Sequence, residues 1–131
     1  AAAESAGVHD LVLGLPEGYA TRVGFPDQPL SGGQIQRIGL ARAIYRLPRF
    51  VVLDEPNAHL DSHGDEALTE TIRLLRKRRC TVVVMAHRPS VLAEASKVLI
   101  LYKGKVGQFG PREKIFRLAM QTVPSGKRKA G

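Results

Sequence analysis

Residues 49–61 set the strongest limit on the fold, because a short apolar run there leads directly into two adjacent carboxylates. The run covers residues 50–53, Asp54 and Glu55 follow it, and Pro56 comes next. A continuous apolar run of this length is typical of a strand buried on both faces in a parallel sheet. Because Pro56 cannot donate a ladder hydrogen bond, we expect the strand to end there. The two acids then lie at the carboxyl end of a central strand.

Two acids at this position predict that the site binds a cation or carries out a reaction. Open α/β sheets bind their ligands at the carboxyl ends of their strands, and a buried charge without a partner costs roughly several kcal/mol. Asp54 is suited to hold Mg²⁺ through water, and the neighbouring Glu55 is suited to polarise an attacking water. A pair of solvated acids in a turn is the alternative that these residues alone leave open.

The composition describes a folded and basic chain. Its 131 residues are enough for one domain with a core, and a hydrophobic fraction of 44% excludes a disordered chain. The formal net charge of +8 is compatible with nucleic acid, an anionic membrane surface or phosphate ligands. Basic residues are concentrated at 73–79 and 127–129. We interpret them as a solvated helix end and a loose tail.

The sequence gives few indications of the cellular compartment. Cys80 is the single cysteine, so no disulfide can form within the chain, and this fits a reducing compartment. No apolar run approaches the ~20 residues of a membrane span, and the chain does not start like a secretion signal. The first residues are helix-like and contain no initiator Met. We therefore expect the chain to be a piece of a longer protein.

Apolar periodicity predicts helices and strands in alternation, which makes the chain α/β. The expected helices cover 1–15, 30–47, 62–79 and 90–95, and a last helix begins at 110–111. The expected strands are 50–53 and 81–85, both buried and parallel, followed by a hairpin of 98–102 and 105–109 around 103–104. Loops or turns are expected at 16–29 and 57–64, and disorder is expected at 123–131.

The helices expected at 30–47 and 62–79 each have a clear apolar face. The inward positions are Leu40, Ala43, Ile44 and Leu47 in the first helix, and Leu68, Ile72 and Leu75 in the second. Ser62 and Asp65 are spaced as a capping box for the second helix. Ser90 is the expected cap of the short helix that follows the second strand.

The helix expected from residue 30 begins with Ser31, Gly32, Gly33 and Gln34. Two glycines allow the backbone to approach a ligand closely, and the free N–H groups at a helix start favour a phosphate. Ser31 can cap the helix or donate to a phosphate oxygen. For these four residues alone, a flexible turn with a serine cap is the favoured interpretation.

His87 follows the second apolar run, as Glu55 follows the first. Because parallel strands end at the same edge of a sheet, His87 is expected near Glu55. A lone histidine at a strand end is usually structural, whereas one beside two acids is less so. Asp61 by itself is interpreted as a turn residue.

Four motifs together resemble one family, the ABC ATPases. They are LSGGQ at 30–34, FVVLDE at 50–55, NAHLD at 57–61 and the histidine of MAHRP, His87. In order and approximate spacing they resemble the signature motif, Walker B, the D-loop and the switch histidine of that family. The resemblance covers residues 1–120 and implies a partial P-loop NTPase core with part of the helical signature subdomain.

Smaller features resemble the exporters of type I secretion in Gram-negative bacteria. LPEGYATRVG at 15–24 is similar to the loop before the signature in exporter-type ATPases, although Phe25 and Asp27 stand where those usually have Glu and Gly. In the family this loop faces the coupling helices of the transmembrane domain, so these departures put the contacts with those helices in doubt. HRPSVL at 87–92, KVLILYKGKVGQFGPREKIF at 97–116 and the NAHLD form of the D-loop resemble that branch most.

The resemblance implies a role for each motif residue. ATP and Mg²⁺ are the implied cofactors, with Asp54 supporting the metal, Glu55 as general base, and His87 sensing the γ-phosphate. The signature residues Ser31, Gly32, Gly33 and Gln34 would bind the nucleotide held by a partner, and Asp61 would bridge to the partner's phosphate loop. Such sites need positioning and charge stabilisation more than covalent chemistry.

The resemblance also implies partners and a place in the cell. The implied assembly is a head-to-tail homodimer of ATP-binding domains, joined to the exporter's transmembrane domain at the cytoplasmic face of the bacterial inner membrane. A periplasmic adaptor and an outer-membrane channel are further implied partners, and nucleic acid is not. Residues 1–48 would end the helical subdomain, 49–120 would form half of the ATPase core, and 121–131 would be a flexible basic tail.

The sequence has no GxxxxGK[ST] phosphate loop. We therefore expect the chain alone to bind ATP weakly and to be inactive as an ATPase. Two rival interpretations stay open: an ABC ATPase that acts on DNA or ribosomes, and a degenerate domain used only as a dimerisation scaffold. Salt-dependent nucleic-acid affinity would favour the first. The presence of both Glu55 and His87 argues against the second.

Overall fold

The structure is a computed structural model that describes residues 1–23 and 30–122. The chain divides into two compact units, Ala1–Glu94 and a second unit that begins at Ala95. The predicted α/β class is confirmed, with a pair of parallel strands in the first unit and an antiparallel hairpin in the second. None of the helices in the described residues is both long and apolar enough to cross a membrane.

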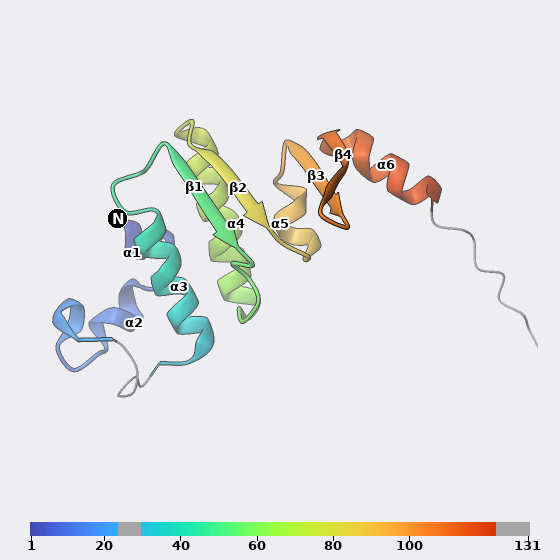
Figure 1. Cartoon of the computed structure of the whole chain (residues 1–131). Coiled ribbons are helices and arrows are strands. Elements are labelled where there is room, and N and C mark those ends of the chain that lie inside the picture. The colour runs from blue at the N-terminus through green and yellow to red at the C-terminus, as the bar shows by residue number, and fades with distance from the viewer. Residues whose placement is uncertain (24–29, 123–131) are drawn as a thin grey trace, which may run out of the picture. The chain divides into compact units, whose positions relative to one another are not determined.

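The first unit contains five α-helices among its described residues, a 3-10 helix and two strands (Figure 1). In chain order they are α1 (Ala2–Ser5), α2 (His9–Leu13), the 3-10 helix η1 (Gly18–Ala20), α3 (Gly32–Ala43), β1 (Phe50–Asp54), α4 (Ser62–Lys77), β2 (Thr81–Met85) and α5 (Pro89–Ala93). The 3-10 helix lies inside the segment expected to be loop.

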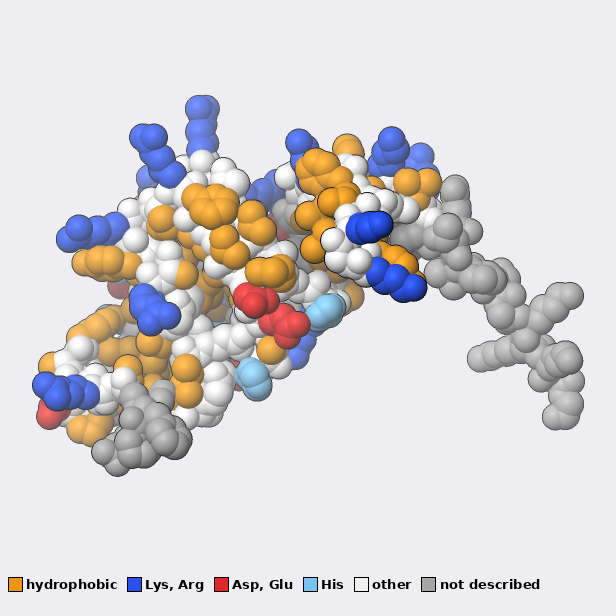
Figure 2. All heavy atoms as spheres, in the orientation of Figure 1, with side chains coloured by type: hydrophobic (Ala, Val, Ile, Leu, Met, Phe, Trp, Pro, Cys, Tyr) orange, Lys and Arg blue, Asp and Glu red, His pale blue; other side chains and the backbone are white. Residues whose placement is uncertain are grey.

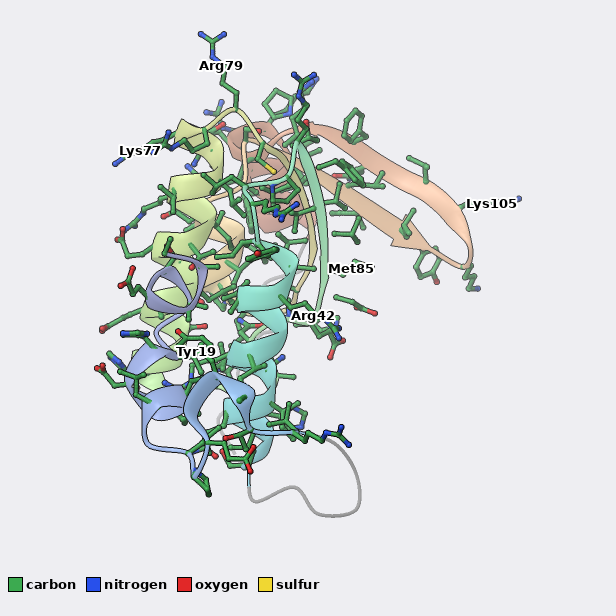
Figure 3. All side chains as sticks on the ribbon, turned by 90° about the vertical axis from the view of Figure 1, so that its left-hand side faces the viewer. Tyr19, Arg42, Lys77, Arg79, Met85 and Lys105 are labelled. Carbon is green, nitrogen blue, oxygen red and sulfur yellow. The ribbon has the colours of Figure 1, made fainter. Side chains whose placement is uncertain are left out.

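Strands β1 and β2 are parallel and end level with one another. Their register pairs Phe50 with Thr81 and Asp54 with Met85, so the residues that follow both strands come out at one edge. Figures 1 and 3 show α4 packed along these strands. This arrangement confirms the predicted parallel pair and brings the expected site residues to a shared edge.

The core of the first unit lies on one face of this sheet. As predicted, Leu68, Ile72 and Leu75 of α4 are buried there, and Val51 and Leu53 of β1 face them. The prediction that both strands are buried on both faces is wrong for the described residues. Side chains alternate between the faces of a strand, so those on the opposite face are exposed: Phe50, Val52, Val83 and Met85.

The single helix expected over 1–15 is divided at Gly7. This glycine has a φ of 62°, which ends α1 before α2 begins. The Val8 N–H donates to the Ala3 carbonyl over 2.8 Å, as in a glycine-terminated helix end. Apolar periodicity continues through the break because the two short helices still share one buried side.

Helix α3 ends four residues earlier than expected. It stops at Ala43, while Arg46 and Leu47 have φ values of 61° and 50°. Leu47 precedes Pro48, and a residue before proline is disfavoured in the helical region. Leu47 is therefore exposed rather than part of the apolar face.

Two expected helix caps are one or two residues from the real ones. Asp61, not Ser62, caps α4, and its carboxylate accepts from the Gly64 N–H over 2.8 Å. Arg88 precedes α5, which begins with Pro89, so Ser90 is not the cap. Proline at the first helical position has a fixed φ that suits a helix start. Helix α5 therefore begins at Pro89, before Ser90.

The basic cluster at 73–79 has two parts. Arg73 and Arg76 form ion pairs with Glu94 at 2.7 and 3.4 Å. Lys77 and Arg79 are exposed, and Figure 3 shows both side chains pointing outward from the region where α4 ends. The cluster therefore combines internal pairing with the solvated helix end that we expected.

The second unit is the predicted hairpin followed by a helix. It consists of β3 (Lys97–Tyr102), β4 (Lys105–Pro111) and α6 (Arg112–Thr122). Lys103 and Gly104 both have positive φ, as a two-residue hairpin turn requires. Pro111 ends β4, so α6 begins one residue later than expected. The predictions for Phe25, Asp27 and 123–131 concern residues outside those described.

Candidate functional site

The acids and the histidine expected at the sheet edge lie together. Asp54 is the last residue of β1, and Glu55 follows it. The Nε2 atom of His87 is 3.1 Å from the Oε1 atom of Glu55. Both side chains are open to solvent, and Figure 2 shows acidic side chains beside a histidine on this face. The site is therefore accessible to a water molecule and to a polar ligand.

Glu55 has an unusual backbone that is held on both sides. Its φ is 43°, a left-handed value that costs a non-glycine residue about 1–3 kcal/mol. Its N–H donates to the Met85 carbonyl over 2.8 Å, and its carbonyl accepts from the Ala58 N–H over 3.1 Å. The side-chain amide of Gln36 also donates to that carbonyl, over 2.7 Å. These bonds fix the direction in which the Glu55 carboxylate leaves the strand.

Asp54 offers the carboxylate that Mg²⁺ needs. The side chain is exposed at the strand end, and Mg²⁺ is commonly bound by one or two carboxylates together with substrate phosphates and waters. Among the described residues no group of three or more His, Cys, Asp or Glu side chains could hold a metal by themselves. Asp54 could therefore supply one carboxylate ligand to a Mg²⁺ ion whose other ligands are waters or phosphates.

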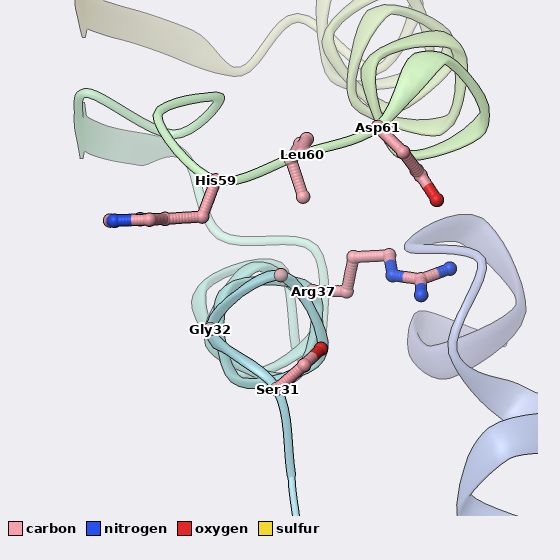
Figure 4. Close-up of a pocket in the computed structure, with 7 residues that line it drawn as sticks. Ser31, Gly32, Arg37, His59, Leu60 and Asp61 are labelled. Atoms are coloured by element: carbon pink, nitrogen blue, oxygen red, sulfur yellow. The ribbon is translucent and has the colours of Figure 1, made fainter.

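A pocket of about 360 Å³ lies at the start of α3 (Figure 4). It is lined by Ser31, Gly32, Gly33, Arg37, His59, Leu60 and Asp61. The pocket therefore contains three of the expected phosphate-binding residues and the expected bridging aspartate. The N–H groups at this helix start give it a positive end.

Ser31 and Gln34 form a capping box. The Ser31 Oγ accepts from the Gln34 N–H over 3.3 Å, and the Gln34 Oε1 accepts from the Ser31 N–H over 2.7 Å. Of the two uses predicted for Ser31, the structure has the cap. Because a hydroxyl has one donor and two acceptor sites, the Ser31 proton remains able to donate to an anion.

Gly33 is required by close packing against the loop after β1. A Cβ atom at Gly33 would lie 2.7 Å from the His59 carbonyl oxygen, whereas one at Gly32 would only meet the His59 ring at 3.6 Å. A distance of 2.7 Å is too short for carbon and oxygen, so a larger residue at 33 would push α3 and this loop apart. Close packing therefore requires glycine at 33, whereas at 32 a Cβ atom would make only an ordinary contact.

Gln36 and Arg37 take part in the site although they were not predicted from the sequence. The Gln36 Oε1 accepts from the His59 N–H over 3.1 Å, in addition to the bond with Glu55. The Arg37 Nη1 donates to the Gly7 carbonyl over 3.2 Å. A polar residue on a helix is usually solvated, so their sequence positions give no sign of these contacts.

The expected site residues thus form two groups. Asp54, Glu55 and His87 lie at the strand edge, and the pocket at the α3 start contains Ser31, Gly32, Gly33 and Asp61. Asp61 also caps α4. Gln36 connects the helix of the second group to the backbone of the first.

Comparisons with known proteins indicate one family. The family model described as ABC transporter matches residues 6–58. The chain is 50% identical over 115 residues to the type I secretion system ATP-binding protein PrsD of Rhizobium meliloti, covering 88% of this chain and 20% of that protein. It is 40% identical to the ABC transporter ATM1 of Toxoplasma gondii, over 84% of this chain and 10% of that protein.

A solved structure of a bacterial Atm1-family ABC exporter with ATP bound is also similar. The TM-score is 0.75 at 30% sequence identity, and the match covers 96% of this chain and 23% of the exporter chain. The chain therefore spans about a fifth or less of the length of the curated relatives described above.

Proposed function

We propose that the chain, a member of the ABC transporter family, is the carboxyl-terminal portion of the ATP-binding domain of an exporter. In the proposed protein, ATP hydrolysis drives transport across the bacterial inner membrane, with type I protein secretion as the process. The 50% identity to a type I secretion protein supports secretion. The contact between Glu55 and His87 at the tips of paired strands is the observation that carries the ATPase proposal.

In this proposal Glu55 is the general base for the attacking water, and His87 holds the Glu55 carboxylate in place. The Glu55 carboxylate takes the proton of the attacking water. Its Oε1 atom is near the His87 Nε2 atom, which keeps the carboxylate at the strand edge and leaves the second oxygen free to face the water. Asp54 would hold Mg²⁺ through water. Bound ATP and Mg²⁺ supply the phosphoryl group and the charge that neutralises it.

The pocket at the α3 start would act on a second nucleotide, held by a partner chain. The N–H groups of the first helical turn and the Ser31 hydroxyl would donate to phosphate oxygens. Gly32, Gly33 and Gln34 would be part of this contact, and Asp61 would reach the partner's phosphate loop. The open pocket and the exposure of Ser31 and Gly32 at the start of α3 support this role.

The proposed assembly is a head-to-tail homodimer at the cytoplasmic face of the inner membrane. Residues 1–48 would end the helical subdomain, 49–120 would complete half of the ATPase core, and 121–131 would be a basic tail. The transmembrane domain of the exporter, a periplasmic adaptor and an outer-membrane channel would be the partners. Closure on ATP and opening after hydrolysis would supply the two states that move the transport segment.

The direct experiment is Glu55→Gln in the full-length exporter. The amide cannot take the proton from water, so we expect ATP turnover to fall roughly a hundredfold or more, while nucleotide binding stays intact. Glu66→Gln, an exposed change on α4, is the matched control and should hydrolyse ATP like the parent. Turnover near the parent value in Glu55→Gln would remove Glu55 from the role of base.

A further inference from the structure

We propose that Gln36 is a positioning residue, whose side chain fixes the turn that carries Glu55 and thereby the position of the Glu55 carboxylate. This inference rests on the proposed ATPase function, because it gives Gln36 a role only through the base. It adds a residue outside the four motifs, located in the second turn of α3.

The Gln36 amide uses both of its ends on backbone groups of one turn. Its Nε2 donates to the Glu55 carbonyl over 2.7 Å, and its Oε1 accepts from the His59 N–H over 3.1 Å. A carbonyl can only accept and an amide N–H can only donate, so these partners determine the orientation of the side-chain amide. One side chain therefore bridges the first and last residues of the segment 55–59.

This bridge acts where the backbone needs support. Glu55 has a φ of 43°, and such a value persists only when surrounding contacts enforce it. The bond from the Ala58 N–H closes the turn locally, whereas the Gln36 bond comes from a different element. Without it, the Glu55 residue would be free to relax toward an ordinary φ, and the carboxylate would move with it.

Close packing brings α3 within reach of this turn. The missing Cβ of Gly33 allows the helix to approach the His59 carbonyl, three residues before Gln36 on the same helix. Gln36 therefore joins the helix of the proposed phosphate-binding pocket to the backbone of the proposed base. A glutamate at 36 would keep the acceptor but lose the donor, and leucine of similar size would lose both.

The test measures ATP hydrolysis by the full-length exporter for Gln36→Leu and Gln36→Glu, each alone and combined with Glu55→Gln. We expect Gln36→Leu to lower kcat roughly ten- to a hundredfold with little change in KM, because a small displacement of a catalytic group has a steep cost. In the Glu55→Gln background, measured by single turnover, the Gln36 change should cost little more. Arg42→Leu, at an exposed position of α3, is the control.

The outcomes separate this inference from the proposed function. Gln36→Leu with a kcat within about twofold of the parent, or with an equal loss in both backgrounds, would overturn the positioning role and leave the ATPase proposal standing. Normal turnover in Glu55→Gln would overturn both. Should Gln36→Leu fail to fold, as judged by thermal unfolding, Gln36→Glu decides by the same comparison, because it keeps the bond from the His59 N–H.

Discussion

The backbone at Glu55 turns out of β1 with a left-handed φ, and its side chain meets His87 rather than continuing the alternation of the strand. Asp54, one residue earlier, keeps the extended backbone of the strand. Two neighbouring carboxylates can therefore have separate tasks, one toward a metal and one toward a water. A strained residue at this point is a reason to expect function there.

At the residue scale, the two glycines of the pocket give a sharp prediction. Gly33→Ala should destabilise the ATP-binding domain by about 1–3 kcal/mol, since the new Cβ meets the His59 carbonyl oxygen. Gly32→Ala makes only ordinary contact and should be neutral or slightly stabilising, because alanine favours the helix. Urea unfolding of the complete domain measures both. Equal stabilities for the two variants would contradict the packing that we describe.

Some contacts of single site residues were predictable from the sequence, and others were not. The neighbourhood of Glu55 and His87 was predictable, because each follows an apolar run and parallel strands end together. The contacts of Gln36 were not, since they depend on how α3 packs against a loop 19 and 23 residues away in the sequence. Local patterns contain no information on such a contact.

At the scale of elements, the cap of α4 gives the next prediction. Asp61→Ala should cost about 0.5–2 kcal/mol of domain stability, because the Gly64 N–H loses its carboxylate partner. Ser62→Ala is the control one residue along, and its effect should stay within about 0.5 kcal/mol. Thermal or urea unfolding compares them. A larger loss for Ser62→Ala would return the cap to the residue expected from the sequence.

The existence of the elements was predictable, but several of their ends were not. The alternation of apolar runs predicts α3, β1, α4 and β2, and the hairpin turn at Lys103–Gly104 follows from its glycine. Element ends depend on single backbone angles, such as the positive φ of Gly7 and Leu47. Apolar periodicity continues across these positions, so it does not detect them.

At the scale of the whole molecule, the outer face of the β1–β2 sheet is the main difference from expectation. Phe50 and Val52 are 58% and 51% exposed, and Val83 and Met85 lie on the same face. An apolar strand face of this kind is typical of a packing surface.

In the proposed dimer, Glu55 of one chain and Ser31 of its partner serve the same nucleotide. Mixing two inactive full-length variants, Glu55→Gln and Ser31→Arg, tests it most directly. A head-to-tail mixed dimer contains one site with both residues intact and one site with both defects. If both residues served a site within a single chain, every site of the mixed dimer would have a defect.

The measurement is ATP hydrolysis by the mixed dimer, isolated through a different affinity tag on each variant. We expect turnover clearly above that of either variant alone, from the one intact site. Turnover of the mixed dimer no higher than that of the two parent variants would contradict it.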